Sequence, residues 1–209
     1  MPKTKYPMCF DPLCERHNAE LSEQPPPMTT ESPTTCGAAV RSSDLLGFPP
    51  VLDACCGGRS FWFDKKNPLA VFVDKRRETW ESNLPGRSPW VIDPDVLCDF
   101  TALPFPDETF YLVVFDPPHM TTLGHNAHMA KKYGRLIGEW RDELAEGFRE
   151  CLRVLKPNGT LVFKWNTTDV PLNEVLALAP IPPLFGHTTG RQAKTIWATF
   201  LKPNDQSQR

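Results

Sequence analysis

The sequence predicts an α/β fold built on a doubly wound, mostly parallel sheet, and three observations lead to this. Four apolar runs follow residue 47, at 50–53, 69–73, 110–115 and 160–164. They are rich in β-branched and aromatic residues, which suits strands that are covered on both faces. The first three runs end at or just before an aspartate, and one helical pattern lies between the third and the fourth. Such alternation of strands and helices is typical of a parallel sheet.

The remaining elements follow in chain order. Residues 139–155 place apolar side chains at steps of three and four, which predicts one buried face of a helix. These side chains are Trp140, Leu144, Phe148, Cys151, Leu152 and Leu155. The sequence Lys156-Pro157-Asn158-Gly159 then ends that helix. Residues 182–185 and 195–201 predict a closing pair of strands around a turn at 186–191.

Two segments of different composition make up the 209 residues. Residues 22–35 are polar and rich in proline, so they cannot bury enough surface to order themselves. We therefore divide the chain into a Pro-rich, partly disordered arm at 1–47 and one domain at 48–204. The arm also carries residue types that bind zinc, but without a second closely spaced pair, so we favour incidental cysteines and expect no metal. These residues are Cys9, Cys14, His17 and Cys36.

Charge and composition exclude several classes of protein. The net charge is −2, so any contact with nucleic acid must be local. No apolar stretch approaches the ~18 residues of a membrane-spanning helix, and the first residues lack the apolar core of a secretory signal. The seven cysteines are an odd number, and Cys55 and Cys56 are adjacent in an apolar run. We therefore expect reduced thiols, a cytoplasmic protein and no membrane partner, while the oligomeric state is not indicated.

The turn after the first strand predicts a ligand site. Asp53-Ala-Cys-Cys-Gly-Gly58 ends a strand with an acid and two glycines, which let a ligand approach the backbone. It matches neither the G-x-G-x-x-G fingerprint of dinucleotide binding nor the G-K-[ST] of a phosphate loop. Asp74 follows the second strand about 20 residues further on, where a carboxylate can accept both hydroxyls of a ribose. Asp99 is a third acid of this series. Each acid taken singly is more often a turn or helix cap, so the prediction depends on the set.

Five segments together resemble the class I, Rossmann-like S-adenosylmethionine-dependent methyltransferases. They are 51–58, 73–74, 99–105, 115–119 and 154–160, and they lie in the family's order along the chain. The resemblance implies a seven-stranded sheet with helices on both faces, an antiparallel last strand, and S-adenosylmethionine as the cofactor. It also implies that a turn made by Asp53, Ala54, Cys55 and Gly57 holds the methionine part. Asp74 would take the ribose hydroxyls, and Asp99 and Phe100 would lie at the adenine.

The sequence Asp116-Pro117-Pro118-His119 indicates the reaction. It resembles the Asp/Asn-Pro-Pro-aromatic motif of methyltransferases that modify exocyclic amino groups, notably N6 of adenine. The lone pair of such an amine is delocalised into its ring, so a carboxylate and a carbonyl must hold both N–H groups and direct the lone pair at the methyl group. Two prolines fix this geometry, and a planar fourth residue stacks on a base turned out of its helix. His119 can stack, and it can also accept a proton. The alternative is a proline turn that merely ends a strand.

Residues 120–135 form a long connection after the predicted catalytic strand, which is a typical place for substrate contacts. Cations and rings alternate there in His128, Lys131, Lys132 and Tyr133, which suits contact with phosphates and stacking on bases. We therefore expect DNA or RNA to bind at 119–135, although an ordinary solvated loop explains the segment equally well. Trp165 ends the fourth strand within Lys164-Trp-Asn166 and is a candidate wall of the substrate pocket, or else a core residue.

Three functions stay open at this point. The first is a nucleic-acid amino-methyltransferase in which Asp116, Pro117, Pro118 and His119 are catalytic. The second is a methyltransferase of a small molecule or a protein, which the net charge and the lack of room for a target-recognition domain favour. The third is a non-catalytic binding module that keeps the fold. We expect the first, with the methyl group passed directly to nitrogen and no covalent enzyme intermediate.

Overall fold

The computed structural model describes residues 47–81, 88–122, 124, 127–188 and 194–204. The chain divides into two units, Met1–Ser32 and Pro33–Arg209, and every described residue belongs to the second. The arm predicted at 1–47, with its four zinc-type residues, therefore lies outside the described residues except for Gly47.

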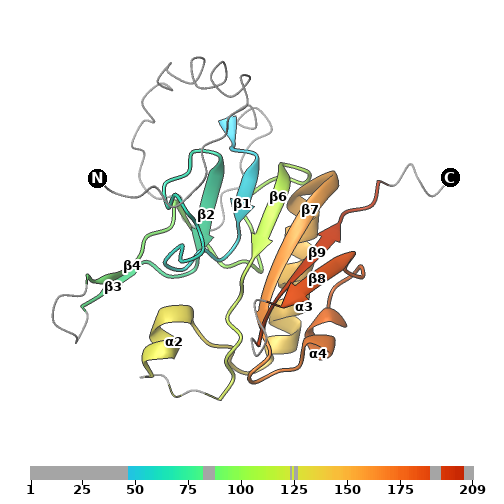
Figure 1. Cartoon of the computed structure of the whole chain (residues 1–209). Coiled ribbons are helices and arrows are strands. Elements are labelled where there is room, and N and C mark those ends of the chain that lie inside the picture. The colour runs from blue at the N-terminus through green and yellow to red at the C-terminus, as the bar shows by residue number, and fades with distance from the viewer. Residues whose placement is uncertain (1–46, 82–87, 123, 125–126, 189–193, 205–209) are drawn as a thin grey trace, which may run out of the picture. The chain divides into compact units, whose positions relative to one another are not determined.

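Seven strands form one sheet in the order β5-β2-β1-β6-β7-β9-β8 (Figure 1). Neighbours from β5 through β7 pair in parallel, whereas β9 is antiparallel to both β7 and β8. This confirms the prediction of an α/β fold with a mostly parallel, seven-stranded sheet. The strands are Val51–Asp53 (β1), Ala70–Asp74 (β2), Val96–Leu97 (β5), Phe110–Phe115 (β6), Leu155–Asn166 (β7), Phe185–Thr188 (β8) and Thr195–Leu201 (β9).

The strand order reverses at β1. From this strand the chain proceeds to β2 and β5 on one side of the sheet and then returns to β6 on the other side. In open α/β sheets, ligands bind outside the carboxyl ends of the strands at such a reversal. The loops that leave the sheet there follow Asp53 of β1 and Phe115 of β6.

The described helices are α2 (His128–Tyr133), α3 (Trp140–Val154) and α4 (Leu172–Leu176). α3 is the helix predicted at 139–155, and its apolar stripe packs into the main core with the inner faces of β6 and β7. A Cβ at Gly147 would lie 2.7 Å from ring atoms of both Phe100 and Phe115, so glycine lets α3 approach these rings. No helix among the described residues is long and apolar enough to span a membrane.

The two faces of the sheet are covered differently. Side chains alternate along β2, so that Val71 and Val73 join the large core with α3 and α4, whereas Ala70 and Phe72 point to the opposite face. That second face holds a small cluster with Trp62, which comes from the turns between β1 and β2. Within the described ranges no helix connects β1 to β2 or β2 to β5. The prediction that helices cover both faces, as in a doubly wound sheet, is therefore not confirmed.

A hairpin that the sequence did not predict lies in the connection from β2 to β5. Its strands, β3 (Glu78–Trp80) and β4 (Trp90–Ile92), pair antiparallel as a separate two-stranded sheet, with Trp80 opposite Trp90. In Figure 1 the hairpin extends away from the main sheet on the β2 side.

Candidate functional site

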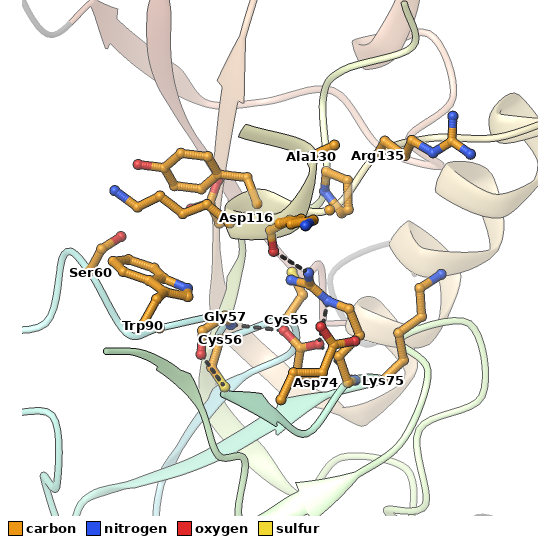
Figure 2. Close-up of a pocket in the computed structure, with 18 of the residues that line it drawn as sticks. Cys55, Cys56, Gly57, Ser60, Asp74, Lys75, Trp90, Asp116, Ala130 and Arg135 are labelled. Carbon is orange, nitrogen blue, oxygen red and sulfur yellow. Dashed lines mark hydrogen bonds and ion pairs between the residues drawn. The ribbon is translucent and has the colours of Figure 1, made fainter. Parts of the chain in front are cut away.

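A cavity of about 330 Å³ lies outside the carboxyl ends of β1, β2 and β6, where the strand order reverses (Figure 2). It is lined by residues 55–58 after β1, 74–76 after β2, and Asp116 and Pro118 after β6. Phe100, the hairpin tryptophans and residues 130–135 line the other sides. Ligand pockets are typically about 300–1,000 Å³ in volume, so this one can hold a nucleoside-sized molecule.

Asp53 ends β1 as a fully buried carboxyl group. The indole Nε1 of Trp62 donates to its Oδ2 at 2.7 Å, and the backbone N–H of Cys55 lies 3.4 Å from its Oδ1. Burial raises the pKa of Asp53 to about 7, and the charges of Asp116 and Asp74 act in the same direction against these two hydrogen bonds. Asp53 and Ala54 are both buried beneath the turn, while Cys55 and Gly57 of the same predicted set line the cavity.

The turn that follows has an unusual backbone. Gly57 has φ 49° and Arg59 has φ 51°, both in the left-handed region that glycine adopts at little cost. The Arg59 side chain is held by the carbonyls of Lys65 (2.5 Å) and Asp93 (2.8 Å), and its guanidinium lies 3.8 Å from the centre of the Phe72 ring. These contacts hold a non-glycine residue in the left-handed conformation.

Asp74 ends β2 and lines the cavity with its carboxylate already engaged. Its Oδ2 accepts the backbone N–H of Gly57 at 2.9 Å, and its Oδ1 accepts the backbone N–H of Arg76 at 2.9 Å. Arg76 Nε lies 3.4 Å from the same oxygen, and the guanidinium also donates to the carbonyl of Lys131 at 2.9 Å. Arg76 therefore links the carboxylate after β2 to α2.

The predicted adenine residues lie on the neighbouring side. Phe100 lines the cavity and meets Phe115 edge to face, with ring centroids 5.2 Å apart. Asp99 accepts the backbone N–H and hydroxyl of Thr101, and it pairs at 3.3 Å with Lys75, which lines the cavity.

Asp116 follows β6 directly and forms an ion pair with a lysine from the end of β7. Lys164 Nζ lies 2.5 Å from Asp116 Oδ2, and the side chains are 20% and 15% exposed. Burial raises the pKa of Asp116 above its ordinary value, and Lys164 opposes that rise. The sequence predicts Lys164 near the end of the fourth strand but indicates no role for it.

His119 lies among rings rather than among carboxylates. Its imidazole centroid is 6.4 Å from that of Tyr133 and 6.1 Å from that of Trp165. Burial and the charge of Lys164 lower the pKa of His119 to about 4 against a weaker opposing effect of Asp169, so the ring is neutral at pH 7. His119 is therefore suited to contact a ligand as a planar, uncharged ring and not as a cation.

The predicted substrate residues are divided by the structure. Lys131, Lys132 and Tyr133 of α2 line the cavity. Trp165 is 1% exposed, donates to the carbonyl of Val170 at 3.0 Å, and touches the site only through His119. The side chain of His128 lies outside what is described. The described residues contain no group of three or more His, Cys, Asp or Glu that could hold a metal ion.

Several cavity residues were not proposed from the sequence. Trp80, Trp90 and Arg76 belong to the hairpin and the loop before it, whose strands are too short to show a periodic pattern. The available signal was composition, because two tryptophans in an otherwise polar segment are unusual for a solvated loop.

Of the known proteins compared with this chain, only solved structures are similar to it. No family model matches the chain, and no curated protein matches its sequence. A Burkholderia thailandensis 1,6-didemethyltoxoflavin-N1-methyltransferase, with 1,6-didemethyltoxoflavin and S-adenosylhomocysteine bound, is 14% identical over 76% of this chain and 73% of its own, with a TM-score of 0.43. A Leishmania major SAM-dependent methyltransferase is 15% identical over 72% of this chain and 63% of its own, with a TM-score of 0.42.

A Thermus thermophilus protein with a proposed role as a DNA modification methylase is 23% identical over 48% of this chain and 47% of its own, with a TM-score of 0.33. Similarities with such low identities and TM-scores assign neither a family nor a substrate. The residues of the cavity must therefore support any function that is proposed.

Proposed function

We propose that the protein is an S-adenosylmethionine-dependent methyltransferase that methylates an exocyclic amino group of a base in DNA or RNA. The observation that carries this proposal is the position of Asp116. Asp116 is the first residue of Asp-Pro-Pro-His. It lines the same cavity as the glycine turn after β1 and Asp74 at the end of β2. An acceptor amine at Asp116 and a nucleoside at Asp74 would thus share one enclosed space.

The residues present fit this cofactor. In the turn at 55–58, nothing lies within 4 Å of the position that a Cβ would take at Gly57, so the backbone there is open to a ligand. At Gly58 the Trp90 ring lies 2.4 Å from that position and packs against the turn. Asp74 would accept the ribose hydroxyls in place of its contacts with Arg76, and Phe100 would pack on the adenine. When bound, the cofactor supplies a methyl group on a positively charged sulfur. Cys55 and Gly57 would hold its methionine part.

The chain's own residues would orient the acceptor. Lys164 occupies Oδ2 of Asp116, which leaves Oδ1 to accept an N–H of the amine. A backbone carbonyl of the Pro-Pro segment would accept the second N–H, which turns the nitrogen lone pair out of the ring plane. Once methylated, the amine nitrogen would have to give up one proton. Asp116 is suited to accept it, because burial makes this carboxylate more basic than an exposed one.

The nucleic-acid assignment is supported by the cations and rings around the opening. Lys131 and Lys132 line the cavity together with Tyr133, and His119 lies behind Tyr133 as a neutral ring. Such a set suits one phosphate-linked base held between planar groups. A small-molecule amine is the second candidate, because the net charge of −2 does not favour a nucleic acid and Arg76 already donates to the carbonyl of Lys131 beside the cavity.

The test is transfer of labelled methyl from S-adenosylmethionine to unmethylated DNA, RNA and a metabolite extract, with the products hydrolysed and identified. We expect labelled methyladenine from a nucleic acid, its loss in Asp116→Ala, and full activity in Asp64→Ala, an exposed aspartate outside the cavity. Label found only in small molecules would show that the acceptor is a small-molecule amine and not a nucleic acid. If no fraction is labelled and S-adenosylhomocysteine does not bind, the proposal that the protein is a methyltransferase is wrong.

A further inference from the structure

The indole N–H of Trp90 is buried and has no hydrogen-bond partner. It is the one buried side-chain nitrogen or oxygen without a partner in the described part of the chain. Native proteins seldom leave such a group unsatisfied, because burial removes water without replacing its hydrogen bond. Trp90 also lines the cavity, so a bound molecule can supply the missing acceptor.

The position of Trp90 shows which part of a ligand would meet this donor. Its ring lies against Gly58, where a Cβ would be 2.4 Å from Cζ2 and 2.8 Å from Cε2, the carbon bonded to Nε1. The donor is therefore next to the turn after β1. Figure 2 shows the indole beside Ser60, with its nitrogen toward Gly57.

A cation accompanies the donor. Lys132 Nζ lies 4.3 Å from the centre of the Trp90 ring and 4.8 Å from that of Tyr133. Asp74 and Asp116 are each already paired with a cation of their own, Arg76 and Lys164. Glu78 is the other acidic residue that lines the cavity. A donor without an acceptor and a nearby ammonium group make this end of the cavity suited to an anion.

We propose that Trp90 Nε1–H and Lys132 Nζ bind the carboxylate of the cofactor's methionine part, so that the β3–β4 hairpin completes the cofactor site. This inference rests on the proposed function. A phosphate of the acceptor is the other source of an anion. The contact of Trp90 with Gly58 favours the cofactor, because that turn is where the methionine part would lie.

The experiment compares two ligands that differ in the methionine part. Binding of S-adenosylhomocysteine and of 5′-methylthioadenosine, which lacks the amino acid, is measured by calorimetry for the wild type, Trp90→Phe, Lys132→Gln and Val91→Ala, an exposed residue of β4 outside the cavity. One hydrogen bond to a charged group corresponds to about 10–100-fold in affinity. We expect Trp90→Phe to weaken S-adenosylhomocysteine by about that factor and to leave 5′-methylthioadenosine unchanged. Lys132→Gln should weaken the same ligand less, and Val91→Ala should not change the affinity for either ligand.

Each outcome decides between separate claims. Equal losses for both ligands in Trp90→Phe would mean that the ring only packs against the turn, and the inference would be wrong while the cofactor assignment stands. Unchanged affinity for S-adenosylhomocysteine with weaker binding of an oligonucleotide would assign the anion to the acceptor and overturn the inference. A wild type that binds neither ligand would overturn the proposed function itself. Binding of 5′-methylthioadenosine by the variant also shows that it is folded.

Discussion

Replacing Lys164 by methionine removes the cation that faces Asp116 and keeps a side chain of similar shape. The two groups are 2.5 Å apart, and both are largely buried. Removing one partner of such a pair costs about 3–5 kcal/mol when the other keeps its charge. Asp116 can avoid part of this cost by taking up a proton, so the loss of stability must depend on pH.

The sign of that dependence follows from the pKa of Asp116. Burial already raises this pKa above its ordinary value, and the loss of Lys164 raises it further. A carboxyl group whose pKa is higher in the folded state stabilises the fold in acid and loses that contribution as the pH rises through its folded pKa. Wild type and Lys164→Met should therefore differ least at low pH, where Asp116 is protonated in both. The difference should grow toward about 3 kcal/mol or more above neutrality.

The measurement is urea unfolding of the two proteins between acid and alkaline pH, repeated in an Asp116→Asn background. The pKa values of Asp53 and Cys55 respond to the charge of Asp116, and that of His119 responds to the charge of Lys164, so the second background isolates the contribution of Asp116. With asparagine at 116, the effect of Lys164→Met should be smaller, and the pH dependence that is left should be that of His119, whose pKa Lys164 lowers. The same destabilisation at every pH, or the same in both backgrounds, would refute the reasoning.

Activity provides a second measurement on the same variants. If Asp116 must be ionised to hold the amine, the acid limb of the pH–rate profile should move to higher pH in Lys164→Met. Lys164→Arg should restore part of the profile, because it returns the charge. A lower rate with an unmoved profile would indicate a packing role alone.

Two further predictions concern the loops around the cavity. At Arg59, with φ 51°, alanine keeps the strained backbone and loses every side-chain contact, so urea unfolding should find Arg59→Ala about 1 kcal/mol less stable than Arg59→Gly, and the reverse order would contradict the strain. Asp169 accepts the backbone N–H and hydroxyl groups of Thr121 and Thr122 just after Asp-Pro-Pro-His. Although burial acts to raise its pKa, these bonds hold the pKa of Asp169 below its ordinary value. Asp169→Ala should therefore cost about 1–2 kcal/mol near neutrality, and this difference should shrink as the pH falls below about 4. A difference that persists in acid would show that the carboxylate charge is not involved.

The elements that the sequence predicts correctly are those with a long pattern or a long apolar run. The helix at 139–155 and the strands ending at Asp53, Asp74 and Phe115 carry such signals, and the structure contains all of them. β3, β4 and β5 have two or three residues each, which is too short for any periodicity to appear. The prediction of helices on both faces is not confirmed, because a buried strand does not show what kind of element covers it. β2 is buried throughout, but on one face its cover is a set of turns with Trp62, which buries apolar side chains as a helix would.

The candidate site was predictable where a residue's position follows from strand ends alone. Asp74 ends β2 and Asp116 follows β6, and both strands are parallel neighbours of β1, so the two residues must lie at the same edge of the sheet. Trp90 and Lys164 could not be assigned roles in this way, because their partners come from segments distant in sequence. Trp165 was a candidate wall of the substrate pocket, but it follows Lys164 directly in the strand. Because side chains alternate along a strand, its side chain lies in the core.

Three carboxyl groups meet where the strand order reverses, and each is stabilised by different means. Asp53 is buried deepest and carries a proton part of the time near neutrality, with Trp62 as its donor. Asp116 is paired with Lys164, whose charge opposes the rise in its pKa that burial causes. Asp74 is held by backbone N–H groups and by Arg76, whose guanidinium is shared with a carbonyl of α2. Of the three, Asp74 is the one whose side-chain partner can be exchanged for a ligand without leaving a buried charge unpaired. With the function proposed above, Asp74 would recognise a polar ligand, Asp116 would orient the acceptor, and Asp53 would support the turn.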